Sequence, residues 1–297
     1  GGPAFSRAVW VPALGEWRTF QNSGTQGVKN IAVADLQASH TDLTQIGLER
    51  LVEIPGVGRW TLEAVYTQKA IRNLLDTYSP TWGYLPELNA AANASAGKKI
   101  IANLPGLERN FKGFDVTAHR RFESGHRLQI SYSHGDLQGN SEVGSVASAT
   151  GKNTGFAQIP SLRQDYRLPQ YSGTLNESVR HAIKAFGSAA LPWGLEISCS
   201  YFRRSGLHYS SLEKISGDLV LATGERRGER ELPWVSSLDL VLAHSFRIQQ
   251  VTWRTSLECY NTTNQQPMIV INNVAGAFTA GNYQQPRVWQ MSVRASF

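Results

Sequence analysis

Long hydrophobic runs, cysteines and charged residues are all scarce in this sequence of 297 residues. No stretch of about 18 apolar residues occurs, which excludes a transmembrane helix but not transmembrane strands, because a strand needs only about 9–11 residues. Cys199 and Cys259 are too few for a disulfide framework or a zinc site, and we expect both to be small apolar fillers. Only 18% of the residues are charged, so Ser, Thr, Asn, Gln and Gly carry much of the polarity.

Sequence signatures of catalysis and cofactor binding are also missing. There is no Gly-x-Ser-x-Gly nucleophile elbow, and Gly151-Lys152 lacks the glycine spacing of a phosphate-binding loop. The histidines show no metal-ligand spacing, and we expect His119, His181 and His208 to be hydrogen-bonding or rim residues. The sequence therefore predicts no enzyme activity, no cofactor and no metal site.

The net charge of +6 raises the question of a nucleic-acid partner, although the basic residues are scattered along the chain. The segment 51–61 resembles the helix–hairpin–helix of DNA glycosylases, in which a glycine-rich turn approaches a phosphate. However, its flanks lack long helical periodicity, and Pro55-Gly56 has an ordinary explanation as a tight turn. We therefore expect no nucleic-acid partner.

The dominant pattern is an alternation of apolar and polar residues in segments of about ten residues, which is typical of half-buried β-strands. It is clearest at the end of the chain, and it predicts nine strands, with a tenth candidate at 7–14. The nine segments lie near 40–51, 59–70, 110–122, 128–133, 178–190, 195–201, 238–247, 251–258 and 289–297. The chain is therefore predicted to be all-β.

The connections between these segments alternate between short and long. The short ones are 52–58, 122–125, 190–193 and 247–250, and the long ones are 71–109, 135–177, 206–234 and 262–286. Outer-membrane barrels have short turns on one rim and long loops on the other, whereas compact soluble domains seldom contain such long loops. We therefore predict that residues 40–297 form an antiparallel transmembrane β-barrel segment. Residues 1–39 would be a lead-in, a loop or one extra strand.

The end of the chain resembles the signal that the outer-membrane assembly machinery recognises. That signal is a strand that ends on an aromatic residue and carries apolar residues at every second position before it. The signal residues here are Trp289, Met291, Val293, Ala295 and Phe297.

Aromatic residues near the ends of the predicted strands fit the same architecture. In a barrel they would form girdles at the two membrane interfaces, whereas in a soluble protein they would belong to the core. These residues are Trp60, Trp193, Tyr201, Trp234 and Trp289.

Five segments resemble, in the right order, strand pairs of TonB-dependent receptors. They are 41–50, 62–76, 113–117 with 126–133, 179–184 with 192–195, and 232–240 with 257–264. The resemblance runs from about residue 36 to the end and implies the C-terminal half of the barrel. It is closest to large receptors that carry an N-terminal carboxypeptidase-regulatory-like domain. Asn261 and Asn264 are expected to be structural, because they close a strand into its loop.

The resemblance implies a bacterial outer-membrane barrel of about 22 strands with a plugged lumen, which imports a substrate with energy from an inner-membrane TonB complex. The implied partners are outer-membrane lipid, the barrel-assembly machinery, and a plug and N-terminal strands from the same or another chain. The TonB complex would act through the region absent here. Two alternatives remain open: a non-transporting structural or scaffold subunit of an outer-membrane complex, and a passive porin of about ten strands. An open set of strands would leave unpaired backbone groups in lipid, so further strands are expected to complete the barrel.

Overall fold

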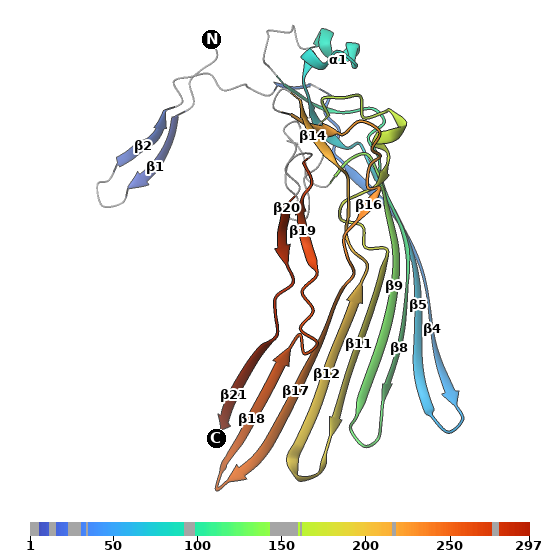
Figure 1. Cartoon of the computed structure of the whole chain (residues 1–297). Coiled ribbons are helices and arrows are strands. Elements are labelled where there is room, and N and C mark those ends of the chain that lie inside the picture. Colours follow the sequence, from blue (N-terminus) through green and yellow to red (C-terminus); the bar gives the residue numbers. More distant parts are fainter. Residues whose placement is uncertain are drawn as a thin grey trace.

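A computed structural model describes residues 6–11, 16–22, 31–33, 35–91, 99–142, 160, 162–215, 218–274 and 279–297. Its main feature is a ten-stranded antiparallel sheet (Figure 1). The nine long strands of this sheet are β4 (His40–Ile54), β5 (Gly58–Arg72), β8 (Arg109–Arg121), β9 (Arg127–Gly139), β11 (His181–Ala190), β12 (Leu195–Arg204), β17 (Val235–Ile248), β18 (Val251–Tyr260) and β21 (Val288–Ser296). Each pairs with the next in this order, so β4 and β21 form the two edges, and β10 (Gly173–Thr174) pairs with the end of β9.

The nine predicted strands are confirmed, with different ends in several cases. The largest difference is β9, which continues to Gly139 and so enters the loop predicted at 135–177. Its apolar alternation fades after Tyr132, but the backbone pairing with β8 continues as far as Arg109 opposite Gly139. Backbone hydrogen bonds do not depend on side-chain polarity, and the sequence pattern therefore underestimates the length of this strand.

Short turns join the long strands at one end of the sheet, which lies at the bottom of Figure 1. The turn between β4 and β5 spans residues 55–57, where the amide of Val57 donates to the carbonyl of Ile54 at 3.0 Å. Gly56 has a φ of 73°, a conformation that glycine adopts without strain. The segment 51–61 is therefore a β-hairpin, and the resemblance to a helix–hairpin–helix does not extend to its structure.

The long connections at the other end contain short elements and a core of their own. These elements are β6 (Leu75–Tyr78), η1 (Pro80–Trp82), α1 (Pro86–Ala91), β7 (Ile100–Asn103), η3 (Pro169–Tyr171), β13 (His208–Tyr209), β14 (Leu212–Ile215), β15 (Asp218–Leu221), β16 (Arg230–Glu231), β19 (Met268–Asn272) and β20 (Thr279–Tyr283). The largest fully buried side chains, Tyr78, Tyr166 and Tyr171, all lie here. We call the described parts of 73–108, 140–180, 205–234 and 261–287 the loop cap.

The N-terminal region contains three short strands. β1 (Ser6–Val11) and β2 (Glu16–Asn22) form a hairpin of their own, and β3 (Ile31–Ala32) pairs in parallel with β7 in the loop cap. β1 thus overlaps the predicted strand at 7–14, but it pairs with β2 and not with the large sheet. Residues 12–15 lie outside the described residues. In the described ranges, no helix is long and apolar enough to cross a membrane.

Candidate functional site

The ten-stranded sheet has two faces of opposite chemistry. Directly paired residues of neighbouring strands point to the same side, and successive residues of one strand point to opposite sides. Val116, Tyr132 and Ile183 form one such row across β8, β9 and β11. The adjacent row on the other side contains Ser131 and Lys184. We call the side of Val116 the apolar face and the side of Lys184 the polar face.

The apolar face exposes large hydrophobic side chains along the whole sheet. They include Ile46, Leu48, Leu62, Tyr66, Phe114, Val116, Ile130, Ile183, Ile197, Leu242, Leu257, Trp289, Met291 and Val293, each at least 36% exposed. Continuous apolar surface of this kind marks contact with a membrane or with another protein. An apolar outer wall is also what a transmembrane strand pattern produces.

The polar face carries a series of ion pairs and hydrogen bonds. Arg254 Nη2 lies 2.8 Å from Glu196 Oε2, which joins β18 to β12 across the intervening strand. His119 Nδ1 lies 3.6 Å from Glu63 Oε1. The hydroxyl oxygens of Ser256 on β18 and Ser292 on β21 are 2.7 Å apart. Side chains of this kind are stable next to water, so the polar face fits a hydrated lumen.

Two pockets lie on the polar face near the loop cap. One, of about 540 Å³, is lined by residues of β4, β5, β8 and β9, including Lys69 and Arg109. The other, of about 750 Å³, is lined by the aromatic, amide and charged side chains of Phe202, Arg204, Asp239, Tyr260, Asn261, Asn282, Tyr283, Gln284 and Gln285, among others. The Oε1 atom of Gln284 is buried and accepts no hydrogen bond from any described residue. This second pocket is therefore a candidate contact site for a polar solute in the lumen.

Asn261 closes β18 into the following loop. It has a φ of 48°, and its side-chain amide donates to the carbonyls of Gln265 and Gln285 at 2.8 Å each. Its backbone N–H donates to Asp239 Oδ1 at 2.8 Å. Asn264, with a φ of 54°, accepts a hydrogen bond from the backbone N–H of Arg287 at 2.9 Å. The structural role predicted for Asn261 and Asn264 is confirmed.

A buried ion network holds the loop cap together. Glu142 Oε1 lies 2.9 Å from Arg227 Nη1, and both side chains are 2% exposed. Arg109 Nη2 lies 2.7 Å from Glu177 Oε2, and its Nη1 is 4.0 Å from Glu142 Oε2. Burial raises the pKa of the Glu142 carboxyl, and the guanidinium of Arg227 opposes that rise. No sequence pattern indicates this network, because its members come from separate loops and from the end of β8.

The three histidines lie in three different environments. His119 is on the polar face, and His181 is on the apolar face, where its Nδ1 lies 2.8 Å from the hydroxyl of Tyr132. His208 is buried in the loop cap, and its Nδ1 is 2.9 Å from the carbonyl oxygen of Gly228. All three have polar partners, as predicted. Among the described residues, no cluster of three or more His, Cys, Asp or Glu could hold a metal ion.

The aromatic residues predicted to form girdles lie toward both ends of the strands. Trp60 is near the turn end of β5, where Arg120 lies 5.9 Å from its ring centroid, and Trp193 is 86% exposed in the turn before β12. Tyr201, Trp234 and Trp289 lie toward the loop end. These residues thus lie toward both ends of the strands, and their role as girdles at the membrane interfaces stays a prediction.

The two cysteines differ in their exposure to solvent. Cys259 is buried, whereas Cys199 is exposed, so the prediction that both are fillers is wrong for Cys199. The exposure of Cys199 follows from its outward position opposite Gly187, which has no side chain to cover it.

The predicted assembly signal lies on the last strand. Every second residue of β21 belongs to it, namely Trp289, Met291, Val293 and Ala295. Phe297 follows the end of that strand and is fully exposed. Recognition by the assembly machinery remains a prediction.

Comparison with known proteins identifies the fold. Neither a family model nor a curated protein matches the sequence. Among solved structures, the outer membrane transporter YddB from Escherichia coli is similar over 92% of this chain, with a TM-score of 0.58 and 12% identity. The FrpB iron transporter from Neisseria meningitidis is similar over 89% of this chain, with a TM-score of 0.52 and 12% identity.

This chain covers only part of either transporter. It spans 34% of the YddB chain and 32% of the FrpB chain. The two-faced chemistry of the sheet, its short turns at one end and its long loops at the other are the features of outer-membrane barrels in general. The chain therefore has the fold of a part of an outer-membrane transporter β-barrel.

Proposed function

We propose that this chain forms part of the wall and the extracellular loops of a TonB-dependent transporter in the bacterial outer membrane. The observation that carries the proposal is the two-faced sheet, together with its similarity to two outer-membrane transporters. The apolar face would contact lipid and the polar face would line the lumen. No chemistry on the substrate is required of these residues.

The polar face, the pocket near the loop cap and the buried ion network would have different roles in transport. The ion pair of Arg254 with Glu196 and the other polar contacts of the polar face support a hydrated passage. The pocket of about 750 Å³ near the loop cap provides a place for solute contact. The buried ion network would hold the loops in a fixed arrangement above that passage. Substrate would therefore first meet a preformed surface.

Closure of the barrel requires strands beyond those of this sheet. β4 and β21 are the edges, and an unpaired edge in hydrocarbon leaves many backbone groups without hydrogen bonds. We infer that further strands, and the plug on which TonB acts, come from the same polypeptide or from a partner chain. If no plug were associated, a structural or scaffold role would replace transport.

The test is capture by the periplasmic domain of TonB. The full native protein is extracted from outer membranes in mild detergent and passed over immobilised TonB domain, with an outer-membrane porin as the control. Retention of the protein but not of the porin supports the transporter. A folded barrel that is not retained, under conditions in which a known TonB-dependent receptor is retained, contradicts it and favours the scaffold.

A further inference from the structure

The short-turn end of the sheet carries arginines that stand directly opposite each other. Arg121 pairs with Arg127 across β8 and β9, and Arg254 pairs with Arg294 across β18 and β21. Each lies within the first or last four residues of its strand, at the bottom of Figure 1. We call these four exposed side chains the arginine belt. Like charges at directly opposite positions destabilise a sheet, so an anionic partner would stabilise this one.

The arginine belt lies on the polar face. Arg121 is two residues beyond His119 on β8, and Arg254 contacts Glu196 across the polar face. The paired arginines point to the same side as these two. Short turns of outer-membrane barrels face the periplasm, so the belt lies at the periplasmic mouth of the proposed lumen. Lipid headgroups lie on the other side of the wall and are not its partner.

The carboxylates of this chain do not neutralise the belt. Among the described residues, only Arg254 of the four has an ion pair, with Glu196 at 2.8 Å. Glu258, four residues along β18 from Arg254, accepts hydrogen bonds from Ser256 and Tyr260 instead. The turn between β8 and β9 contains Glu123, which forms no ion pair with either flanking arginine. Three guanidinium groups of the belt are therefore available to a partner.

The hairpin of β4 and β5 provides a comparison within the same sheet. Glu53 stands directly opposite Arg59, and Arg59 Nε lies 3.6 Å from Glu53 Oε2. Both point to the polar face, because Glu53 follows Glu49, the pair of Glu63, by four residues. This hairpin thus neutralises its own charge at its turn end. Unpaired positive charge is therefore particular to the belt and not general at this end of the sheet.

The distance between the two arginine pairs limits the kind of partner. Four strand-to-strand steps separate Arg127 on β9 from Arg254 on β18, which is about 19 Å along the sheet at about 4.8 Å for each step. A small anion reaches only one pair at a time. An extended polypeptide covers about 3.3 Å with each residue, so a segment of about six residues would reach both pairs.

We propose that the arginine belt docks an acidic segment of the plug. Its Asp or Glu side chains would accept charge-assisted hydrogen bonds from Arg121, Arg127 and Arg294, while Arg254 keeps Glu196. Such a contact is polar and screened by salt, so the plug could leave the wall without exposing apolar surface. The proposal rests on the transporter function proposed above and assigns the wall side of one plug contact.

Carbodiimide cross-linking of the full native protein in outer membranes tests this contact. The reagent joins a lysine amine to a carboxylate that touches it, whereas arginine does not react. Three variants each place one reactive amine in the belt and keep its charge: Arg121→Lys, Arg127→Lys and Arg294→Lys. Peptide mass spectrometry identifies the joined residues, and the wild type shows the cross-links of the native lysines.

Two further variants are matched controls. Arg59→Lys is the positive control, because Glu53 lies beside that position on the same face. Its cross-link shows that the reagent reaches the polar face and that the hairpin is folded. Arg120→Lys is the negative control, because it adds an amine next to Arg121 on the opposite face, where Arg120 lies 4.0 Å from the ring centroid of Phe122.

The expected result is that each belt variant forms a cross-link to an Asp or Glu outside these 297 residues. The yield should be severalfold above that of Arg120→Lys and should fall severalfold in about 1 M salt. Cross-links confined to Glu123, Glu196 or Glu258 would overturn the docking site. The same holds for no cross-link where Arg59→Lys reacts, or for an anionic polysaccharide on the belt in place of polypeptide.

These outcomes can be separated from a failure of the transporter itself. A protein that the TonB domain retains, but whose belt forms no cross-link to an outside carboxylate, would still be a transporter without this docking site. A protein that the TonB domain does not retain, but whose belt forms the expected cross-links, would overturn the transporter and support an acidic segment at the belt.

Discussion

Glu142 and Arg227 form an ion pair that is almost completely removed from solvent. Removing one partner of such a pair leaves a buried charge, which is more costly than losing the pair as a whole. Arg227 also donates through Nε to the carbonyl oxygen of Tyr171 at 2.6 Å, so its side chain joins two loops of the cap. At the scale of single residues, this pair links two loops of the cap.

We therefore predict that Arg227→Met lowers the stability of the loop cap by about 3–5 kcal/mol. Adding Glu142→Gln to that variant should recover much of the loss, because the carboxylate that lost the guanidinium of Arg227 is then replaced by a neutral amide. Hydrogen exchange of the backbone amides near Tyr171 measures both effects. Equal protection in the wild type and in Arg227→Met would contradict the role of the pair.

A second ion pair makes part of the loop cap sensitive to acid. Arg230 Nη2 donates to Glu225 Oε1 at 2.5 Å, and this hydrogen bond lowers the pKa of the Glu225 carboxyl below its ordinary value of 4.5. Because the folded-state pKa is the lower one, the contribution to stability is complete above pH 4.5 and is lost as the pH falls through the lowered pKa. The protection factors of backbone amides near Glu225, which correct the exchange rate for its intrinsic dependence on pH, should therefore fall below that pH. The Glu225→Gln variant should not show this fall, and an identical pH profile of the protection factors would refute the assignment.

At the scale of the strand, β9 provides a matched test of the two faces. Ile130 points to the apolar face and Ser131, the next residue, points to the polar face. We predict that Ile130→Arg costs about 2–4 kcal/mol of folding free energy in lipid vesicles, because it places a charge in hydrocarbon. Ser131→Arg should have a small effect. Denaturant titration of the refolded protein measures both, and similar losses for the two variants would argue against a lipid-facing surface.

The last strand carries the prediction about assembly. If Trp289, Met291, Val293, Ala295 and Phe297 are the signal, Phe297→Ala should cause a severalfold fall in the amount of folded protein in the outer membrane. Ser296→Ala, which changes the neighbouring residue, is the control. Unchanged levels of the Phe297 variant in freshly induced cells would show that the signal lies elsewhere.

Strands and turns could be predicted from the sequence, because a sheet between two different environments imposes a period of two on each long strand. Thus Trp289 to Phe297 shows the alternation directly, and Pro55-Gly56 marks a turn. The loop cap could not be predicted in this way. Its strands have two to five residues. Its core depends on contacts between distant positions, such as that of Tyr84 with Tyr166, whose ring centroids are 5.9 Å apart, and no local pattern encodes them.

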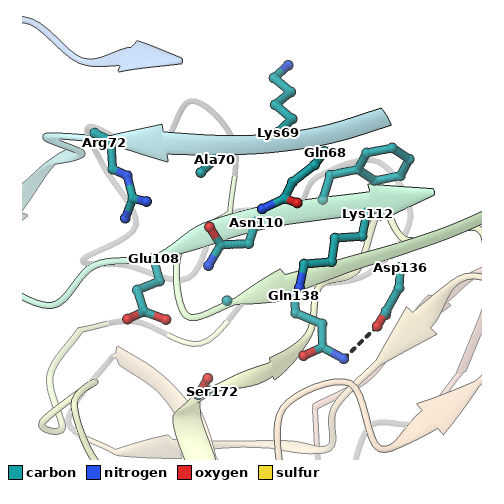
Figure 2. A pocket seen from close by; sticks show the side chains of 12 residues that line it. Gln68, Lys69, Ala70, Arg72, Glu108, Asn110, Lys112, Asp136, Gln138 and Ser172 are labelled. Carbon is teal, nitrogen blue, oxygen red and sulfur yellow. Dashed lines mark hydrogen bonds between the residues drawn. The ribbon is translucent and has the colours of Figure 1, made fainter. Parts of the chain in front are cut away.

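The candidate sites were harder to predict from the sequence than the fold. Glu142 and Arg227 are 85 positions apart, and only the folded loops bring them together. Lys112 and Asp136 line a pocket of about 400 Å³ on the apolar face (Figure 2), and they share a row because β8 and β9 pair over their whole length. The residue types at these positions are ordinary, so the sequence alone gives no signal for either site.

At the scale of the whole molecule, the open sheet is the decisive feature. The edge strand β4 carries four large apolar side chains that are each at least 57% exposed: Leu43, Ile46, Leu48 and Leu51. An edge of this length and apolarity is prone to pair with other strands, and in lipid such pairing is required. Completion of the barrel by further strands is therefore the central claim at this scale.

The most direct test of that claim is the intact mass of the native polypeptide extracted from the outer membrane. The chain has a mass of 32.7 kDa and spans 34% of the YddB chain, so a complete transporter is predicted to have a mass of about three times 32.7 kDa. Such a mass, with this sequence inside it, would show that the remaining strands and room for a plug are present in one polypeptide. A folded, monomeric outer-membrane protein of 32.7 kDa without an associated chain would contradict the account.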